Sequence, residues 1–488
     1  MLQYLDDDIV TLRRADGTTR QYFWGDRCEV IEEKPDRLRV RIHGAKEVVD
    51  EGDVSKSTRL RAGGVLRLSM VDVQQGDGLI LETPQGRVIF IDGGDNKLFA
   101  RHAAARFSGT TEGDPLVVDA MVVTHGDADH FLGLNDLRES ETDARLRKRI
   151  FVAPKRVYHN GLVKRPGQRN DVDTPELQLL GPTVEAGGQA YCVGLVEDPA
   201  LLAPRERNQP FEQWVATLEA WKPRVQQATG DAMLVRRLDH TTTDAFDFLH
   251  DEDIEVELLG PITEPTVAGP GLAFLRDPPD DAGLLLGLQP TARQGGYSAS
   301  HTINGHSISF RLRFGNVRFL LTGDLNQESM QRLREALPDT SLQAEILKTP
   351  HHGAADFDYS FLEDVSPVVS LISSGDESAA KEYIHPRATL MAALGKASRS
   401  MPAVIFCTEL AAFFSIRGMV DDPRAPGRKF FAFERTNFGI AHIRTDGRRV
   451  LAFTHSGRGG MNEAYRFTVS ETGVVAFARK AVKRSAPR

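Results

Sequence analysis

Cysteine is scarce in this sequence of 488 residues, and its three cysteines, Cys28, Cys192 and Cys407, lie far apart. They show no Cys-x-x-Cys spacing, so the sequence indicates neither a disulfide framework nor a thiolate metal site. We therefore expect all three to be buried as small apolar side chains.

Long apolar runs and an excess of positive charge are also missing. No run reaches the ~18 residues that a membrane span requires, and residues 1–8 lack the basic and apolar regions of a signal peptide. The formal net charge of −8 disfavours a protein that coats nucleic acid without selectivity. These absences predict a cytoplasmic protein that does not contact membranes.

What the sequence does have is the length and composition of a globular protein. Hydrophobic residues make up 41% of the chain and charged residues 26%, which is ordinary for a folded protein in water. Because 488 residues exceed the size of one typical core, we expect two or three units.

A dense group of potential metal ligands lies at 124–130, which reads Thr-His-Gly-Asp-Ala-Asp-His. The β-branched segment 117–123 before it predicts a buried strand, and a helix is expected to begin at 131–134. The four ligand side chains, two imidazoles and two carboxylates, are His125, Asp127, Asp129 and His130. Such nitrogen and oxygen donors suit Zn²⁺ or Mn²⁺. The alternative is an acidic helix cap flanked by surface histidines.

Further candidate ligands follow two later strands. The predicted strand 316–321 leads to Asp324, and the predicted strand 344–349 leads to the adjacent His351 and His352. A carboxylate at a strand end is what two ions ~3.5–4 Å apart need as a bridge. The sequence therefore places a second group of ligands far downstream of the first.

Together these segments resemble the ComEC-like branch of the metallo-β-lactamase fold, which takes its name from the C-terminal domain of the competence DNA-uptake channel. The matching segments are Val-Asp-Val-Gln-Gln-Gly-Asp at 71–77, Asp-Gly-Gly at 92–94, the cluster at 125–130, Leu-Thr-Gly-Asp at 321–324, Leu-Lys-Thr-Pro-His-His-Gly at 347–353 and Tyr-Ile-His-Pro at 383–386. The likeness covers roughly 65–135 and 300–395. Two departures are Gln74, at a position usually occupied by glycine, and Asp127, where most members of the fold have histidine.

The resemblance implies an α/β fold class, an αββα metallo-β-lactamase-type sandwich with ligands on loops at one edge. The alternating segments 23–31 and 37–42 predict a β-hairpin and resemble a small SH3-like β barrel. We expect an SH3-like domain at 1–62, a hydrolase domain at 63–400 with an insertion at about 165–300, and a β-rich C-terminal extension at 401–488.

The resemblance also implies a role for each matched residue. His125 and Asp127 would hold one divalent ion, Asp129 and His130 the other, Asp324 would bridge them, and His352 would complete the second site. Asp129, His351 and His385 are the catalytic candidates, and Asp92 would lie just outside the ligands. The cofactors would be two divalent metal ions, Zn or Mn. The remaining ligand position stays open among His301, Asn304 and His306.

Positive charge gathers just after the first ligand cluster. The residues are Arg145, Arg147, Lys148, Arg149, Lys155, Arg156, Lys164, Arg165 and Arg169. If this stretch borders the site, it would attract a phosphate-bearing substrate. A solvated helix face is the alternative reading.

The predicted function is metal-dependent hydrolysis by a metal-activated water, of a phosphodiesterase or nuclease type, with DNA and RNA as candidate substrates. A first alternative is hydrolysis of a small phosphoester, or of a lactam or thioester carbonyl, by the same fold. A second is a metal-stabilised binding or regulatory module that recruits a protein partner through the SH3-like unit. Structural zinc sites are usually rich in cysteine, which disfavours the second alternative.

Overall fold

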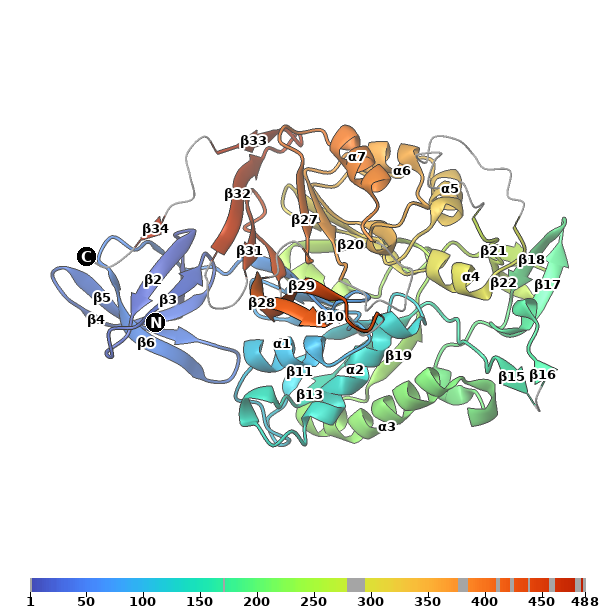
Figure 1. The fold of residues 1–488 in the computed structure, drawn as a ribbon, viewed down its shortest axis with the longest axis horizontal. Helices are drawn as coiled ribbons and strands as arrows, with labels where there is room; N and C mark the ends of the chain where they lie inside the picture. The colour runs from blue at the N-terminus through green and yellow to red at the C-terminus, as the bar shows by residue number, and fades with distance from the viewer. Residues whose placement is uncertain are drawn as a thin grey trace.

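The core of the molecule is a pair of mixed β-sheets, seen in a computed structural model that describes residues 2–169, 172–278, 295–375, 385–409, 413–421, 425–437, 439–455, 461–478 and 484–485 (Figure 1). The first sheet has the strand order β19 (Leu234–Arg237), β14 (Arg156–His159), β12 (Ala120–Val122), β10 (Val88–Ile91), β9 (Leu79–Glu82), β8 (Leu66–Val71), β30 (Ile440–Thr445), β31 (Arg449–His455), β32 (Met461–Val469), β33 (Val475–Phe477). The second has the order β20 (Ile254–Gly260), β23 (Ser309–Phe314), β24 (Val317–Leu321), β25 (Ile346–Lys348), β26 (Val369–Ile372), β27 (Val404–Cys407).

The two sheets pack face to face, and helices cover their outer faces. Leu68 and Ile91 of the first sheet and Phe310 and Phe319 of the second belong to one buried apolar cluster between the sheets. The helices against the first sheet are α1 (Leu98–Arg106), α2 (Ala128–Ser140) and α3 (Gln209–Thr229). Those against the second are α5 (Gln327–Ala336), α6 (Tyr359–Val365) and α7 (Ala388–Ala397). The layers helix, sheet, sheet, helix confirm the predicted mixed α/β class.

Strands at the N-terminus form a sheet of their own. Its order is β3 (Thr19–Phe23), β2 (Ile9–Arg13), β6 (Val48–Ser55), β5 (Arg37–His43), β4 (Arg27–Glu33), β1 (Leu2–Leu5), β7 (Leu60–Arg61), with β34 (Arg484–Ser485) alongside β2. The predicted hairpin is confirmed as β4 and β5, and this sheet encloses a small apolar core. A second apolar cluster, in which Phe23 and Trp24 meet Leu451 and Phe453, joins the unit to the first sheet. The SH3-like assignment and the boundary at residue 62 stay predictions.

The region 165–300 contributes to several layers. It supplies α3, the edge strands β19 and β20, and a small sheet of β17 (Thr183–Ala186), β18 (Gln189–Cys192), β22 (Gly269–Ala273) and β21 (Glu264–Thr266). The short pair β15 (Gln168–Arg169) and β16 (Val172–Asp173) and the helix α4 (Ala299–Gly305) complete it. The apolar stripe of α3, which includes Trp214 and Trp221, is buried against the first sheet.

The segment 117–123 is not the single strand that its composition predicts. It divides into β11 (Leu116–Val118), which pairs with β13 (Val152–Pro154), and β12, which joins the first sheet. Asp119 separates them because its backbone N–H donates to the carbonyl of Val88 at 2.8 Å and its carboxylate accepts from the N–H of Val88 at 3.1 Å. The chain thereby changes sheets in one residue.

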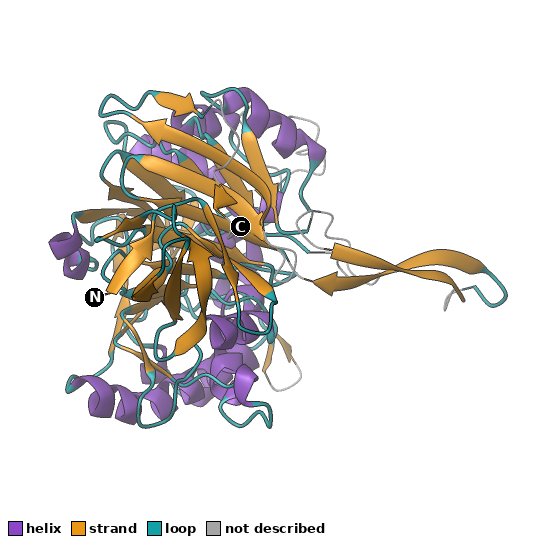
Figure 2. Cartoon of the chain, turned by 90° about the vertical axis from the view of Figure 1, so that its left-hand side faces the viewer, coloured by secondary structure: helices purple, strands orange, loops and turns teal. Residues whose placement is uncertain are grey.

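Within the segment predicted as a β-rich C-terminal extension, β30, β31 and β32 form a meander that lies beside β8 in the first sheet. The hairpin β28 (Phe413–Asp421) and β29 (Lys429–Asn437) pairs only with itself among the described residues and projects from the body (Figure 2). The basic tail 479–488 lies almost wholly outside the described residues, as do Tyr383 and Ile384 of the last matched motif. Among the described helices, none is long and apolar enough to cross a bilayer.

Candidate metal centre

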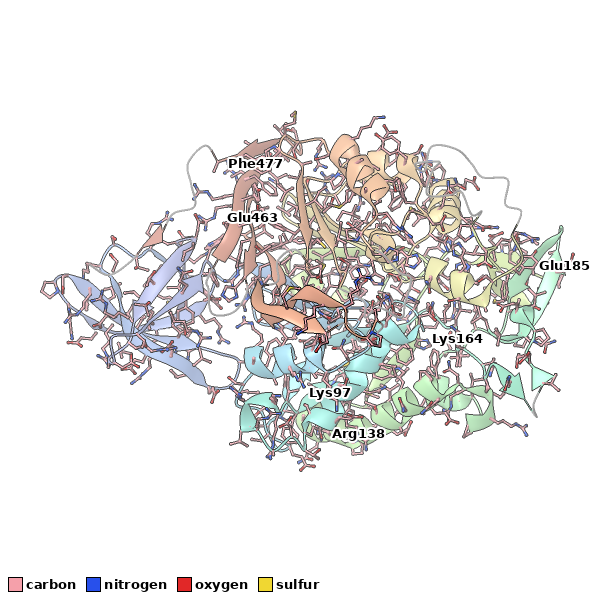
Figure 3. The ribbon with its side chains drawn as sticks, in the orientation of Figure 1. Lys97, Arg138, Lys164, Glu185, Glu463 and Phe477 are labelled. Atoms are coloured by element: carbon pink, nitrogen blue, oxygen red, sulfur yellow. The ribbon has the colours of Figure 1, made fainter. Side chains whose placement is uncertain are left out.

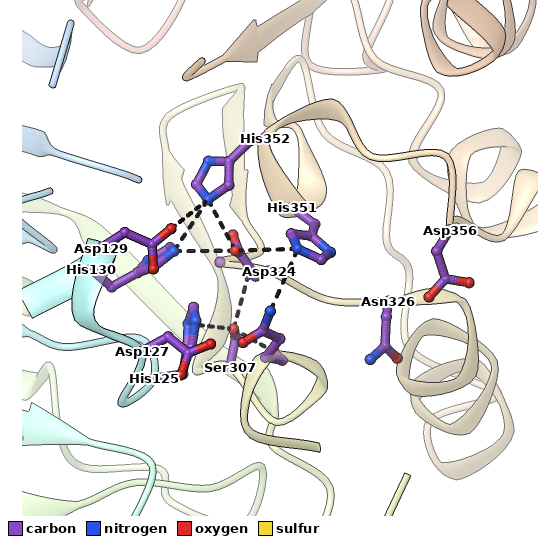
Figure 4. A network of polar contacts seen from close by, with 12 residues as sticks. His125, Asp127, Asp129, His130, Ser307, Asp324, Asn326, His351, His352 and Asp356 are labelled. Atoms are coloured by element: carbon purple, nitrogen blue, oxygen red, sulfur yellow. Dashed lines mark hydrogen bonds and ion pairs between the residues drawn. The ribbon is translucent and has the colours of Figure 1, made fainter. Parts of the chain in front are cut away.

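The predicted ligands meet where parallel strands of both sheets end. In the first sheet β10 ends before Asp92, and β12 ends before His125. In the second, β24 and β25 end before Asp324 and the loop 350–353. Because the carboxyl ends of parallel strands share one edge, segments more than 200 residues apart in sequence come together here (Figure 4).

His130, Asp324 and His352 form the centre of the cluster. Nε2 of His130 lies 3.1 Å from Oδ2 of Asp324 and 3.3 Å from Nε2 of His352. Nε2 of His352 lies 3.0 Å from the same carboxylate oxygen. All three side chains are buried. Their nitrogen and oxygen atoms are therefore close enough to share one cation.

The hydrogen bonds on the far side of each ring fix which atoms face the centre. Nδ1 of His130 lies 2.8 Å from a carboxylate oxygen of Asp92, and Nδ1 of His352 lies 3.1 Å from the carbonyl of Ser373. Both partners are acceptors, so each Nδ1 donates, and in the neutral ring each Nε2 presents a lone pair. Two lone pairs and the carboxylate of Asp324 then face one another at about 3 Å, which requires a positive charge among them.

The pKa values of the two histidines reflect this demand for positive charge. Burial disfavours the charged form of His130, but Asp324 and Asp92 outweigh it and raise its pKa well above the ordinary value. Burial acts in the same way on His352, and there Asp324 and Asp77 raise the pKa to about 9. In a site of this kind a metal ion competes with protons for the same nitrogen atoms. The donor set fits a divalent cation.

The cluster divides into overlapping groups of potential ligands. His125 is within ligand distance of His130 and Asp324, and Asp129 is within ligand distance of His130 and His352. A carboxylate oxygen of Asp129 also accepts from Nε2 of Gln75 at 3.0 Å. His130 thus belongs to both groups, whereas the family resemblance implies that it binds one ion only.

Asp127 lies apart from these groups, at the N-terminus of α2. Nζ of Lys164 lies 3.0 Å from one of its oxygens, and burial raises its pKa. Figure 3 shows Lys164 between α2 and α4. With the side-chain amide turned to satisfy both of its ends, Asn304 donates to Asp127 at 2.8 Å and lies 3.3 Å from Nε2 of His125. The role of Asp127 as a ligand stays a prediction.

The three residues that competed for the remaining ligand position point in different directions. His306 is buried and its Nε2 bonds to the carbonyl of Ala273 at 2.7 Å, while Nε2 of His301 lies 3.3 Å from Asp356. Asn304 lies beside predicted site residues, because its side-chain amide is 2.8 Å from Asp127 and also lies 3.5 Å from Nε2 of His351. The geometry favours Asn304 as the neighbour of the centre.

His351 and His352 are adjacent in sequence but diverge in space. The loop places His351, His352 and Gly353 at φ values of 44°, 51° and 88°, the left-handed region that non-glycine residues rarely adopt and that is retained mainly at functional sites. The side chain of His352 is 4% exposed and that of His351 is 23% exposed, with Nε2 of His351 4.0 Å from Asp324. The ring of His385 lies 6.0 Å from that of His351. Burial lowers the pKa of His351, and lowers that of His385 to about 3.

Sequence reasoning missed a buried ion pair beneath the centre. Nζ of Lys348 contacts the carboxylate of Asp77. It also lies 2.9 Å from the carbonyl oxygen of Gly323 and 3.5 Å from a carboxylate oxygen of Asp324. Both Lys348 and Asp77 are about 1% exposed. Asp77 also lies 3.5 Å from Nδ1 of His352. The signal was a lysine within a β-strand that is otherwise apolar, since a buried lysine requires a carboxylate partner.

The basic stretch mostly turns away from the centre. Arg156 lies over the ring of Phe248, and Arg165 pairs with Glu206. Lys164 is the member of the stretch that contacts a predicted ligand among the described side chains. Of the basic residues named here, Lys164 alone brings positive charge to the site, so the stretch contributes less charge there than the sequence predicted.

Comparisons with known proteins give partial matches. No family model matches the chain. It is 28% identical over 96 residues to ComE operon protein 3 of Bacillus subtilis (strain 168), a match that covers 20% of this chain and 12% of that protein. It also aligns with the crystal structure of a long form RNase Z from yeast, with 10% identity and a TM-score of 0.25, over 63% of this chain and 37% of that one.

Proposed function

We propose that this chain is a metal-dependent hydrolase of the metallo-β-lactamase superfamily that cleaves phosphodiesters with two divalent ions, Zn²⁺ or Mn²⁺. The observation that carries the proposal is the buried convergence of His130, His352 and Asp324. Those atoms repel one another unless a proton or a metal ion lies among them. The four-layer fold, the order of the motifs along the chain and the partial similarity to ComE operon protein 3 support the assignment.

The ligands would divide around Asp324. His125 and Asp127 would hold one ion, Asp129, His130 and His352 the other, and Asp324 would bridge. When bound, the two ions would supply water activation near neutral pH and polarisation of the phosphoryl oxygens. Asp92 keeps Nε2 of His130 directed at the centre by accepting from Nδ1.

His351 and His385, on the more exposed side of the site, would stabilise the leaving oxygen. His351 is the more exposed of the adjacent pair, and His385 lies next to it. Because burial keeps both rings in the neutral form, each offers an N–H to the charge that develops on the leaving oxygen. Asp129, held by Gln75, orients the opposite side of the site.

The test combines metal content with hydrolysis. The purified chain, loaded with Zn²⁺ or Mn²⁺ and dialysed, should hold two ions by elemental analysis and should hydrolyse bis-para-nitrophenyl phosphate. Asp324→Asn should lower both quantities, and Asp339→Asn, an exposed change elsewhere, is the matched control. A content that stays at or below one ion under saturating metal would count against the dinuclear site.

A second candidate is hydrolysis of a small phosphoester or of a lactam or thioester carbonyl. The narrow basic border favours it, because Lys164 faces the centre while Arg156 and Arg165 are engaged elsewhere. Parallel assays with single-stranded DNA, duplex DNA, RNA, a phosphomonoester, a lactam and a thioester separate the candidates. The highest kcat/KM on a polynucleotide would favour the first candidate, and the highest value on a small ester or carbonyl would favour the second.

A further inference from the structure

A cavity of about 1350 Å³ lies between the N-terminal sheet and the first sheet of the main body. Its wall is formed by β3 and β4 on one side and by β8, β9, β30 and α1 on the other. None of the predicted metal ligands lines it. Its volume exceeds the roughly 300–1,000 Å³ typical of small-molecule sites. The cavity is therefore large enough for a separate ligand.

Positive charge dominates the wall. Its charged residues are Arg14, Arg20, Arg27, Lys46, Arg67, Arg106, Arg147 and Arg444, against Asp26, Glu47 and Glu82. Arg14 and Lys46 are neutralised by carboxylates outside the wall, which are Asp50 and Asp114. Six cations then face three carboxylates, in a chain whose net charge is −8. Such local reversal of sign favours an anionic ligand.

Three guanidinium groups and two carboxylates lie together in the wall. Arg67 and Arg106 both contact Glu82 at 2.9 Å, and Arg444 contacts Asp26 at 2.8 Å. The side chains of Arg67 and Arg444 are 9% and 8% exposed. One positive charge is left over in this group, in which Arg67 and Arg444 are buried and Arg106 is 31% exposed. A bound anion would balance that charge.

Hydrogen-bond donors in the wall also lack acceptors. The Nε atoms of Arg27, Arg67 and Arg444 are buried and have no hydrogen-bond partner. A buried donor without an acceptor costs about 1–3 kcal/mol. Phosphate oxygens are the acceptors that guanidinium groups match best, because they take up parallel N–H bonds. These Nε atoms are closed off from the cavity, so the excess charge of the guanidinium groups, and not the unmade hydrogen bonds, argues for an anionic ligand.

Flat, uncharged groups line the same space. Tyr22 and Phe23 come from the N-terminal sheet, and His102 and His442 from the main body. Burial lowers the pKa of His102 to about 4 and that of His442 well below its ordinary value, so both rings are neutral near pH 7. Neutral imidazoles and aromatic rings provide stacking faces and hydrogen bonds for a heterocyclic base.

We propose that this cavity binds a nucleotide, with its phosphates against Arg27, Arg67 and Arg444 and its base against the aromatic and imidazole side chains. The site is independent of the metal centre. Strand β8 connects the two regions, because Arg67 and Ser69 line the cavity and the chain after Val71 leads to Asp77. The junction between the N-terminal sheet and the main body is then also a ligand site.

The test is calorimetric titration of the full chain, freed of metal by a chelator so that the metal centre does not contribute. The ligands are ATP, AMP, adenosine and inorganic phosphate. We expect ATP and AMP to bind and adenosine to bind far more weakly. Arg27→Gln and Arg444→Gln should each weaken ATP binding by roughly 10–100-fold, the value of a hydrogen bond to a charged group. Asp324→Asn should leave it unchanged.

The matched control is Arg466→Gln. Arg466 pairs with Asp8 at 2.6 Å across the same junction but does not line the cavity. Circular dichroism shows whether each variant is folded, and Arg27, which is only partly buried, keeps the test valid if Arg444→Gln fails to fold. Three results would overturn the proposal: no nucleotide binding by the folded chain, equal weakening by Arg466→Gln and Arg27→Gln, or inorganic phosphate binding as tightly as ATP.

Discussion

The adjacent histidines of the loop after β25 allow a sharp test, since the same substitution at neighbouring positions should have opposite effects. Nε2 of His352 lies 3.0 Å from Asp324 and 3.3 Å from His130, whereas Nε2 of His351 lies 4.0 Å from Asp324 on the more exposed side. His352→Ala removes one of the buried donors and should lower the metal content from two ions to about one per chain. His351→Ala should leave the metal content unchanged.

Turnover separates the two variants further. His351→Ala should reduce kcat on bis-para-nitrophenyl phosphate by ~10²–10⁴, the range for loss of a general acid or of a donor to the leaving oxygen. His351→Gln, which retains an N–H donor, should recover part of that loss. Metal content by elemental analysis and initial rates are measured on the same preparations. If His351→Ala empties a metal site and His352→Ala does not, the assignment of the loop is wrong.

Three further predictions concern the surroundings of the centre, the unit junction and the thiols. Asp92→Ala frees Nδ1 of His130 and should weaken metal affinity by roughly 10–100-fold in competition with a chromophoric chelator; an affinity equal to that of the Asp339→Ala control would contradict this. Asp26→Asn leaves the buried Arg444 without its carboxylate and should lower the free energy of unfolding by about 3–5 kcal/mol in urea denaturation, while no change beyond that of the exposed Asp16→Asn would refute it. The three cysteines are buried and unpaired, and burial raises the pKa of Cys28 and Cys192 to about 12, so Ellman's reagent should detect three thiols only after denaturation.

The sequence allowed the centre to be located better than it allowed its internal arrangement to be predicted. His125, Asp129, His130, Asp324 and His352 converge as expected, because each follows a predicted strand and parallel strands end at one edge. The division into two ligand sets did not follow from spacing, since it depends on the direction of each side chain. Asn304 was separated from His301 and His306 only when the structure placed the latter two against Asp356 and Ala273.

Contacts between distant segments outside the ligand cluster could not be predicted. The pair of Lys348 and Asp77 joins β25 of the second sheet to the loop between β8 and β9 of the first, and no periodicity in either segment indicates the other. The break at Asp119 was missed for a similar reason. An apolar run with one carboxylate predicts a single strand, and the hydrogen bond from the N–H of Val88 to Asp119 is visible only in the structure. The C-terminal extension was predicted to be rich in β-strands, but the position of β30 beside β8 was not predicted.

That position has a consequence for how the chain folds during synthesis. Strand β8 ends at Val71 and its neighbour β30 begins at Ile440, so one side of β8 has no partner until most of the chain has left the ribosome. Contacts between such distant residues form slowly, and an unpaired strand edge promotes aggregation until its partner strand pairs with it. Products that stop before Ile440 should therefore accumulate as insoluble material or as chaperone-bound chains, even though every predicted metal ligand has already been made.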